Sequence, residues 1–168
     1  MIKSLISVFI VISFVATSQA SPIPPAPNLN VKAYVVMDFD SKMILASSNK
    51  DLTLPPASIT KMMTAYVAFT ELKEKNISLD EEILVSKKAW KTGGSKMFIE
   101  VGKRVKVRDI LQGVITVSGN DASVALAEHI SGDEKTFTTY MNQMAANLGL
   151  SNTNYTNATG LPNESLYT

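Results

Sequence analysis

Cysteine is absent from this sequence, and histidine occurs once, as His129. Disulfides and thiolate chemistry are therefore excluded. A Ser-His-Asp hydrolase needs its histidine beside an activated serine, and no motif ties His129 to one, so we expect a structural or surface histidine. No cluster has metal-ligand spacing, and we expect neither a metal nor another cofactor. The formal net charge of only +1 gives no reason to expect nucleic acid as a partner.

Prolines are few and concentrate near the N-terminus, after an apolar run. Lys3 precedes the apolar residues 5–15, and small residues at 18–20 resemble a cleavage site, which predicts a secretory signal peptide over residues 1–20. An uncleaved N-terminal anchor is the alternative. Four prolines within residues 21–30 predict an extended spacer. An exported protein without cysteine fits the bacterial periplasm, or the outer face of the cytoplasmic membrane.

Residues 31–168 have the hydrophobic content and periodicity of one α/β (α+β) domain. Alternation and turn residues predict a hairpin of strands 31–38 and 43–46. Residues 77–85 should be extended and residues 86–102 irregular. Helices are predicted over 58–73, 107–117, from about 120 to 130, and over 134–148, the last capped by Asp133. A single hairpin leaves the antiparallel sheet incomplete.

The stretch Pro55–Thr64 places Ser58 three residues before Lys61, at the start of an apolar helix. Residues i and i+3 share a helix face, about 4.5 Å apart along the axis, so the lysine can reach the serine hydroxyl. Apolar residues nearly all round the helix predict burial, and burial favours the neutral amine. A neutral amine can take the serine proton, which gives a nucleophile without histidine.

Chance can also produce this pair. Ser58 as a helix cap, with Lys61 as a solvated charge, is the simpler interpretation of the isolated pattern. Ser47 and Lys50 have the same spacing in a polar turn with no apolar helix behind them. The pair therefore needs support from the rest of the chain.

Ser118-Gly119-Asn120 interrupts two apolar helices and forms a second candidate element. A glycine between two hydrogen-bonding side chains lets the backbone turn sharply and aim both into one space. A hydroxyl can then pass a proton to a leaving amine, and a side-chain amide can hold a peptide group. An ordinary helix–helix turn, capped by Ser118 or Asn120, is the alternative.

Together the motifs point to a family. The stretch 56–64, followed 60 residues after Ser58 by Ser118-Gly119-Asn120-Asp121-Ala122, resembles the serine-type D-Ala-D-Ala carboxypeptidases. These are low-molecular-mass penicillin-binding proteins of peptidase family S11. The resemblance continues through residues 94–98, 148–150 and 160–161. It implies a β-lactamase/transpeptidase-like fold, with residues 31–168 forming the N-terminal part of the catalytic domain.

The resemblance also implies roles. Ser58 would attack a peptidoglycan stem peptide ending in D-Ala-D-Ala and form an acyl-enzyme, with Lys61 as general base. Ser118 would relay the proton to the departing D-alanine, and Asn120 would bind the substrate amide. The Ser58 N–H would form half of the oxyanion hole. β-Lactams would acylate the same serine.

This sequence departs from the family's pattern at one motif. The third motif, Lys-Thr-Gly, lies on a strand roughly a hundred residues beyond the second. Here Lys91-Thr92-Gly93 precedes Ser118, and the chain ends 48 residues after Asn120. We interpret residues 91–93 as a coincidence and expect a piece of a longer protein with weak or no turnover. Membrane association would need a C-terminal region beyond these residues.

Two other functions remain open. A class A β-lactamase uses the same nucleophile, but favours Ser-Asp-Asn at the second motif and a glutamate that activates water; this chain has Ser-Gly-Asn and no convincing equivalent glutamate. A non-catalytic peptidoglycan- or penicillin-binding remnant is the third interpretation, and the missing strand motif favours it.

Overall fold

The computed structural model describes residues 25–168. The predicted signal peptide, residues 1–20, lies outside the described residues, as does the start of the spacer; residues 25–29 have no regular secondary structure. The chain divides into two compact units, one ending at Lys50 and one spanning Asp51–Thr168. None of the helices among the described residues is long and apolar enough to cross a membrane.

The N-terminal unit contains the predicted hairpin. Strands β1 (Tyr34–Met37) and β2 (Ile44–Ser48) pair antiparallel. The carboxylate of Asp38 accepts the backbone N–H of Ser41 at 2.8 Å, which closes the reverse turn. The two strands bury little by themselves, because their large apolar side chains are 47–59% exposed: Val35, Val36, Met37, Ile44 and Leu45.

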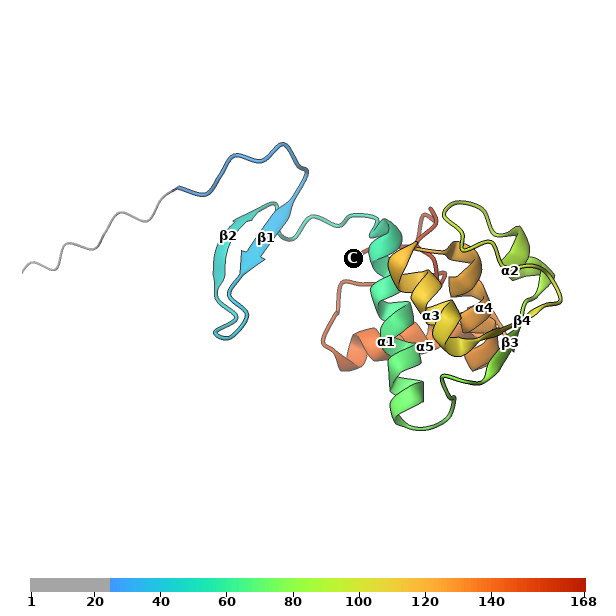
Figure 1. The fold of residues 1–168 in the computed structure, drawn as a ribbon. Helices are drawn as coiled ribbons and strands as arrows, with labels where there is room; N and C mark the ends of the chain where they lie inside the picture. The colour runs from blue at the N-terminus through green and yellow to red at the C-terminus, as the bar shows by residue number, and fades with distance from the viewer. Residues whose placement is uncertain (1–24) are drawn as a thin grey trace, which may run out of the picture. The chain divides into compact units, whose positions relative to one another are not determined.

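The second unit is mainly helical (Figure 1). A 3₁₀ turn, η1 (Ala57–Ile59), leads directly into α1 (Thr60–Lys73). The remaining helices are α2 (Lys87–Lys91), α3 (Val107–Thr116), α4 (Asn120–Ser131) and α5 (Glu134–Asn147). Strand β3 (Glu82–Leu84) pairs antiparallel with β4 (Arg104–Lys106). The described sheets have two strands each, which confirms an α/β fold with an incomplete sheet.

Helix α4 is the centre of this unit. It contacts α1, α2, α3, α5 and β3, and eight consecutive residues, 120–127, are buried. One hydrophobic cluster joins α4 to α3, β3 and α2, and a second joins α1 to α5 and the C-terminal segment. The first residues of α4 are therefore fixed from several sides.

Two predictions for the middle of the chain were wrong. Residues 86–102 are not wholly irregular, because they contain α2, whose first turn is capped by the Ser86 hydroxyl accepting from Ala89 N–H at 3.0 Å. Strand β4 also gives a second antiparallel pair beside the single predicted hairpin. Both elements are short, and β4 exists only through a partner about twenty residues upstream, so neither has a strong local pattern.

The predicted burial of α1 on all sides is also wrong within the described chain. Met63, Val67 and Ala68 are at most 5% exposed, but Met62, Tyr66 and Phe69 on the same helix are 43–73% exposed. One face of α1 packs into the core, and the other lines an open pocket.

Candidate active site

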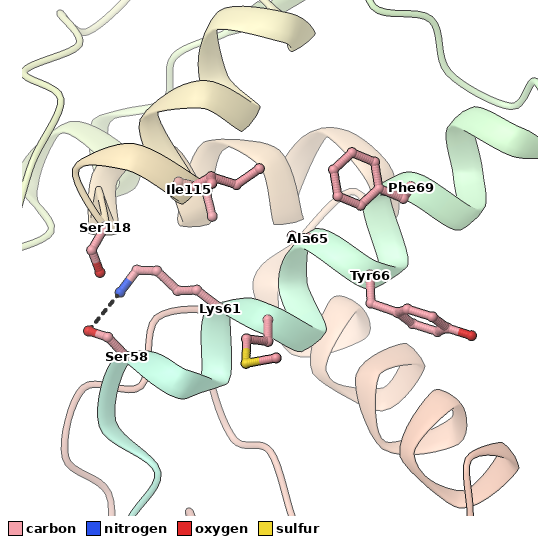
Figure 2. Close-up of a pocket in the computed structure, with 9 residues that line it drawn as sticks. Ser58, Lys61, Ala65, Tyr66, Phe69, Ile115 and Ser118 are labelled. Atoms are coloured by element: carbon pink, nitrogen blue, oxygen red, sulfur yellow. Dashed lines mark hydrogen bonds between the residues drawn. The ribbon is translucent and has the colours of Figure 1, made fainter. Parts of the chain in front are cut away.

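A pocket of about 400 Å³ lies between the start of α1 and the end of α3. Ser58, Lys61 and Ser118 stand at one end of it (Figure 2). Apolar side chains line the rest: Met62, Ala65, Tyr66, Phe69, Val114 and Ile115. The structure therefore brings three of the four predicted site residues to one pocket.

Ser58 lies in η1, one turn earlier than the α-helix in which we predicted it. Pro56 precedes the turn, and Ala57 has a φ of 48°, in the left-handed region. Ile59 is the N-cap residue of α1 and no side chain caps that helix, so Ser58 is not a helix cap. Ser58 is exposed and lines the pocket.

Lys61 is buried, with 5% exposure. Its Nζ donates to the carbonyl oxygen of Thr159 at 2.7 Å and lies 3.4 Å from the Ser58 Oγ. Burial lowers the pKa of Lys61 below the usual 10.5. The interpretation of Lys61 as a solvated surface charge is therefore excluded, and the amine can reach the serine hydroxyl.

Ser118 connects α3 to α4 and is half-buried. Figure 2 shows its hydroxyl facing the amine of Lys61, opposite Ser58. The predicted reason for the glycine that follows was wrong: the left-handed residue is Ser118 itself, with a φ of 54°, while Gly119 has an ordinary φ of −63°. Space constrains Gly119 instead, because an added Cβ would lie 3.1 Å from the Asp121 carboxylate and 3.3 Å from the Gly113 carbonyl oxygen.

Asn120 begins α4 and is 5% exposed. It does not line the pocket. Its side-chain Nδ2 donates to the Gly93 carbonyl oxygen at 2.7 Å, and its backbone N–H donates to the Ser95 carbonyl oxygen at 2.7 Å. One amide N–H and the Oδ1 are left for other partners.

Sequence reasoning missed the role of Asp121. This carboxylate is 1% exposed and accepts the backbone N–H groups of Met97, Phe98, Ile99 and Ala122 at 2.9–3.2 Å. It fixes the loop that contacts Asn120. The available signal was an acidic residue in the first turn of a helix that is apolar from Val124 to Ala127.

Sequence reasoning also missed the importance of the turn 157–161. It supplies the Thr159 carbonyl that contacts Lys61, across 98 residues of sequence. Gly160 has a φ of 82° and lies so close to Ala57 that an added Cβ would overlap the Ala57 carbonyl oxygen. The turn therefore packs directly against η1.

The other candidates lie elsewhere. Lys91 ends α2, and Thr92 and Gly93 follow it, so this Lys-Thr-Gly is not on a strand. Ser47 lies on β2, and Lys50 in the turn after it. His129 is on α4 with its Nε2 3.0 Å from the Glu81 carboxylate. Among the described residues, no three His, Cys, Asp or Glu side chains cluster to hold a metal.

Comparisons with known proteins identify the family of this chain. A family model described as D-alanyl-D-alanine carboxypeptidase, peptidase family S11, matches residues 18–168. The D-alanyl-D-alanine carboxypeptidase DacA of Haemophilus influenzae is 43% identical over 144 residues, covering 84% of this chain and 37% of that protein. DacF of Bacillus subtilis is 40% identical, covering 81% of this chain and 35% of that protein.

Solved structures give the same result. The carboxypeptidase DacD of Francisella tularensis superimposes with a TM-score of 0.84 at 43% identity, covering 89% of this chain and 37% of that chain. Penicillin-binding protein 5 of Haemophilus influenzae gives a TM-score of 0.83 at 42% identity, covering 87% and 43%. The chain thus spans well under half the length of these relatives. It has the penicillin-binding protein fold and belongs to the D-alanyl-D-alanine carboxypeptidase family, S11.

Proposed function

We propose that this chain carries the nucleophile, the base and the proton relay of a serine D-Ala-D-Ala carboxypeptidase. The substrate is a peptidoglycan stem peptide ending in D-Ala-D-Ala, and β-lactams acylate the same serine. The observation that carries the proposal is the buried Lys61 amine, 3.4 Å from the Ser58 Oγ and facing Ser118. Membership of family S11 supports the choice of substrate.

In the acylation step, the Ser58 Oγ attacks the carbonyl carbon of the penultimate D-alanine, and its proton moves to the neutral Lys61 Nζ. The tetrahedral intermediate collapses when the carbon–nitrogen bond to the last D-alanine breaks. Ser118 donates its hydroxyl proton to the leaving amine and is reprotonated from Lys61. Water then attacks the ester, which releases the shortened peptide and restores Ser58.

Asn120 binds the substrate amide in this proposal, through the Oδ1 and the N–H that Gly93 does not use. The Ser58 backbone N–H, near the start of α1, supplies half of the oxyanion hole. The 3.4 Å between Lys61 and Ser58 is long for a hydrogen bond, and such contacts commonly shorten when substrate binds.

The location follows from the same function. We propose export by the signal peptide at residues 1–20 and action in the bacterial periplasm, at the outer face of the cytoplasmic membrane. The named relatives are bacterial proteins, which supports this.

A second candidate is cleavage of an internal peptide bond. A relative from Pseudomonas aeruginosa named D-alanyl-D-alanine endopeptidase is 33% identical over 94% of this chain. The same serine–lysine chemistry would serve either reaction, and the difference would lie in the substrate that the pocket accepts.

Labelling with a fluorescent penicillin tests the acylation step. We expect the label on the tryptic peptide that contains Ser58, and none on a folded Ser58→Ala variant. A folded protein that takes no label, or takes it elsewhere, would contradict the proposal.

Three further assays separate the alternatives. Release of D-alanine from a linear stem pentapeptide indicates the carboxypeptidase, and cleavage of a crosslinked dimer indicates the endopeptidase. Hydrolysis of penicillin at many turnovers per second would instead identify a β-lactamase. Stem-peptide binding that survives Ser58→Ala, with no product released by the wild type, would identify a non-catalytic binding protein.

A further inference from the structure

The turn 157–161 is organised by one side chain. The Asn157 Oδ1 accepts the Thr159 N–H at 3.1 Å, the Thr159 hydroxyl at 2.9 Å and the Gly160 N–H at 2.7 Å. Its Nδ2 donates to the Leu161 carbonyl oxygen at 3.0 Å. Four hydrogen bonds from one amide fix the path of the backbone through the turn.

The same turn is fixed to the helices on both sides of Ala158. The Ala158 N–H donates to the Glu134 carboxylate at 3.0 Å, and the Ala158 carbonyl accepts the Thr64 hydroxyl at 2.8 Å. Glu134 also pairs with Lys88 at 2.7 Å. The chain therefore enters the turn from a fixed point on α5 and α1, and Asn157 controls the direction in which Thr159 then points.

This arrangement fixes the position of the Thr159 carbonyl group. Thr159 is 2% exposed, and its carbonyl oxygen accepts a hydrogen bond from the Lys61 Nζ at 2.7 Å. A neutral amine has two N–H groups and one lone pair. With one N–H held by Thr159, rotation about the Cε–Nζ bond is restricted, and the lone pair can be kept towards the Ser58 hydroxyl.

We propose that Asn157 is a positioning residue of the active site, which acts through the Thr159 carbonyl to orient the Lys61 amine towards Ser58. It touches neither the substrate nor the reacting atoms. This inference rests on the proposed function for its effect on catalysis. The contact itself is a property of the chain alone.

The test compares second-order rate constants of acylation by a fluorescent penicillin. We expect Asn157→Ala to acylate about 10- to 100-fold more slowly than wild type, because the amine loses its fixed orientation. Asn157→Asp keeps an oxygen for all three donors around Thr159 and Gly160 and should recover most of the rate. Each variant is measured on its own high-pH plateau, so that the added charge of the aspartate does not enter the comparison.

Asn142→Ala is the matched control. The Asn142 amide makes the same kind of contact, accepting the Tyr155 N–H at 2.7 Å and donating to the Tyr155 carbonyl oxygen at 2.8 Å. It does not contact residues 157–161 in any of these bonds. We expect this variant to lose thermal stability, like Asn157→Ala, and to acylate within about twofold of wild type.

Two results would overturn the proposal. One is a folded Asn157→Ala variant that acylates at the wild-type rate. The other is an Asn142→Ala variant that loses as much rate as Asn157→Ala, which would show that any loosening of the turn region is sufficient. If Asn157→Ala does not fold, Asn157→Gln replaces it, because the extra methylene displaces the oxygen while keeping the amide; a wild-type rate there also overturns the proposal.

A second readout separates this proposal from the proposed function. If wild type is not acylated, the function fails, and the contact is tested by NMR titration of the Lys61 Cε. Release of the turn in Asn157→Ala would admit water to the amine and move the pKa of Lys61 towards 10.5. An unchanged titration midpoint would show that Asn157 does not act on Lys61.

Discussion

Two loops support the candidate site, and they are held by different kinds of side chain. The loop 93–99, which contacts Asn120, is fixed by the Asp121 carboxylate, which is 1% exposed. The turn 157–161, which contacts Lys61, is fixed by the neutral and only half-buried amide of Asn157.

The difference follows from what each loop offers. Residues 97–99 present consecutive N–H groups, and a carboxylate, which only accepts, matches them fully. Residues 159–161 present both donors and an acceptor, and an amide matches both. A buried charge that loses its partners has a large desolvation cost, so lost hydrogen bonds at Asp121 should cost more stability than lost hydrogen bonds at Asn157.

Gly160→Ala should have the largest effect, because it breaks the turn on the Lys61 side completely. The new Cβ would overlap the Ala57 carbonyl oxygen, and the φ of 82° is unfavourable for alanine. We expect a loss of more than about 4 kcal/mol in the free energy of unfolding, and no acylation. Urea denaturation and penicillin labelling measure the two effects.

Gly149→Ala is the control for that variant. Gly149 has a similar φ of 77° but no atom within 4 Å of an added Cβ. It should lose only about 1–2 kcal/mol and remain active. Equal losses in the two variants would show that backbone conformation, and not the close approach to Ala57, makes Gly160 necessary.

Asp121→Asn should have the next largest effect and tests the charged anchor directly. Asparagine keeps the shape but replaces one acceptor oxygen by an NH₂ group that faces backbone N–H groups. We expect a loss of about 2–4 kcal/mol in stability, together with slower acylation because Asn120 loses its fixed position. Asp133→Asn, at the exposed N-cap of α5, should lose much less stability, because asparagine also caps helices well. Similar losses at both positions would show that burial of the Asp121 carboxylate does not make it more sensitive to substitution than an exposed one.

The pH dependence of acylation tests whether Lys61, which the turn 157–161 contacts, is the base. Burial places the pKa of Lys61 below 10.5, so its neutral, proton-accepting fraction rises with pH through a midpoint below that value. We expect the acylation rate to follow this fraction. Since the unfolded lysine binds its proton more tightly, this group also makes stability rise as pH increases from the folded pKa to 10.5.

Stopped-flow labelling from about pH 6 to pH 10 measures that profile. Lys61→Arg provides the control, because a guanidinium does not lose its proton in this range and should abolish acylation. A rate that does not change with pH, or an active arginine variant, would exclude Lys61 as the base.

Tyr140→Phe should have the smallest effect. It is the reference for a lost hydrogen bond between helices that lies outside the two supporting loops. The Tyr140 hydroxyl donates to the Glu71 carboxylate at 2.6 Å, and this contact raises the pKa of Tyr140 to about 12. Glu71 keeps its bond from Asn76, so we expect a loss of about 1 kcal/mol in stability and no change in acylation. A slower acylation rate would show that the site responds to any loss of helix packing, not specifically to its two supporting loops.

Local patterns explain what the sequence predicted correctly. The hairpin, α1, α3, α4 and α5 have strong periodicity, and Asp133 caps α5 as predicted, accepting the Thr136 N–H at 2.9 Å. Ser58 and Lys61 are three residues apart, so the geometry of a helical turn was enough to bring them together. The roles of the four site residues stay predictions.

Long-range contacts explain what was missed. Asp121 reaches residues more than 20 positions away, and Thr159 reaches Lys61 across 98. No local pattern reports which distant backbone groups a carboxylate or an amine will find. The left-handed residue at Ser118 is a similar case, because glycine beside it was the more plausible place for a sharp turn.

The distance in sequence between Lys61 and its carbonyl partner has a consequence for biosynthesis. A ribosome that adds about 5–20 residues per second makes Thr159 roughly 5–20 s after Lys61. During that interval the nascent chain already contains Ser58, but its lysine lacks the contact that aims it. If Ser58 is the nucleophile, it gains a positioned base only when the turn 157–161 docks against Lys61, so it stays inactive while the residues between them are being made.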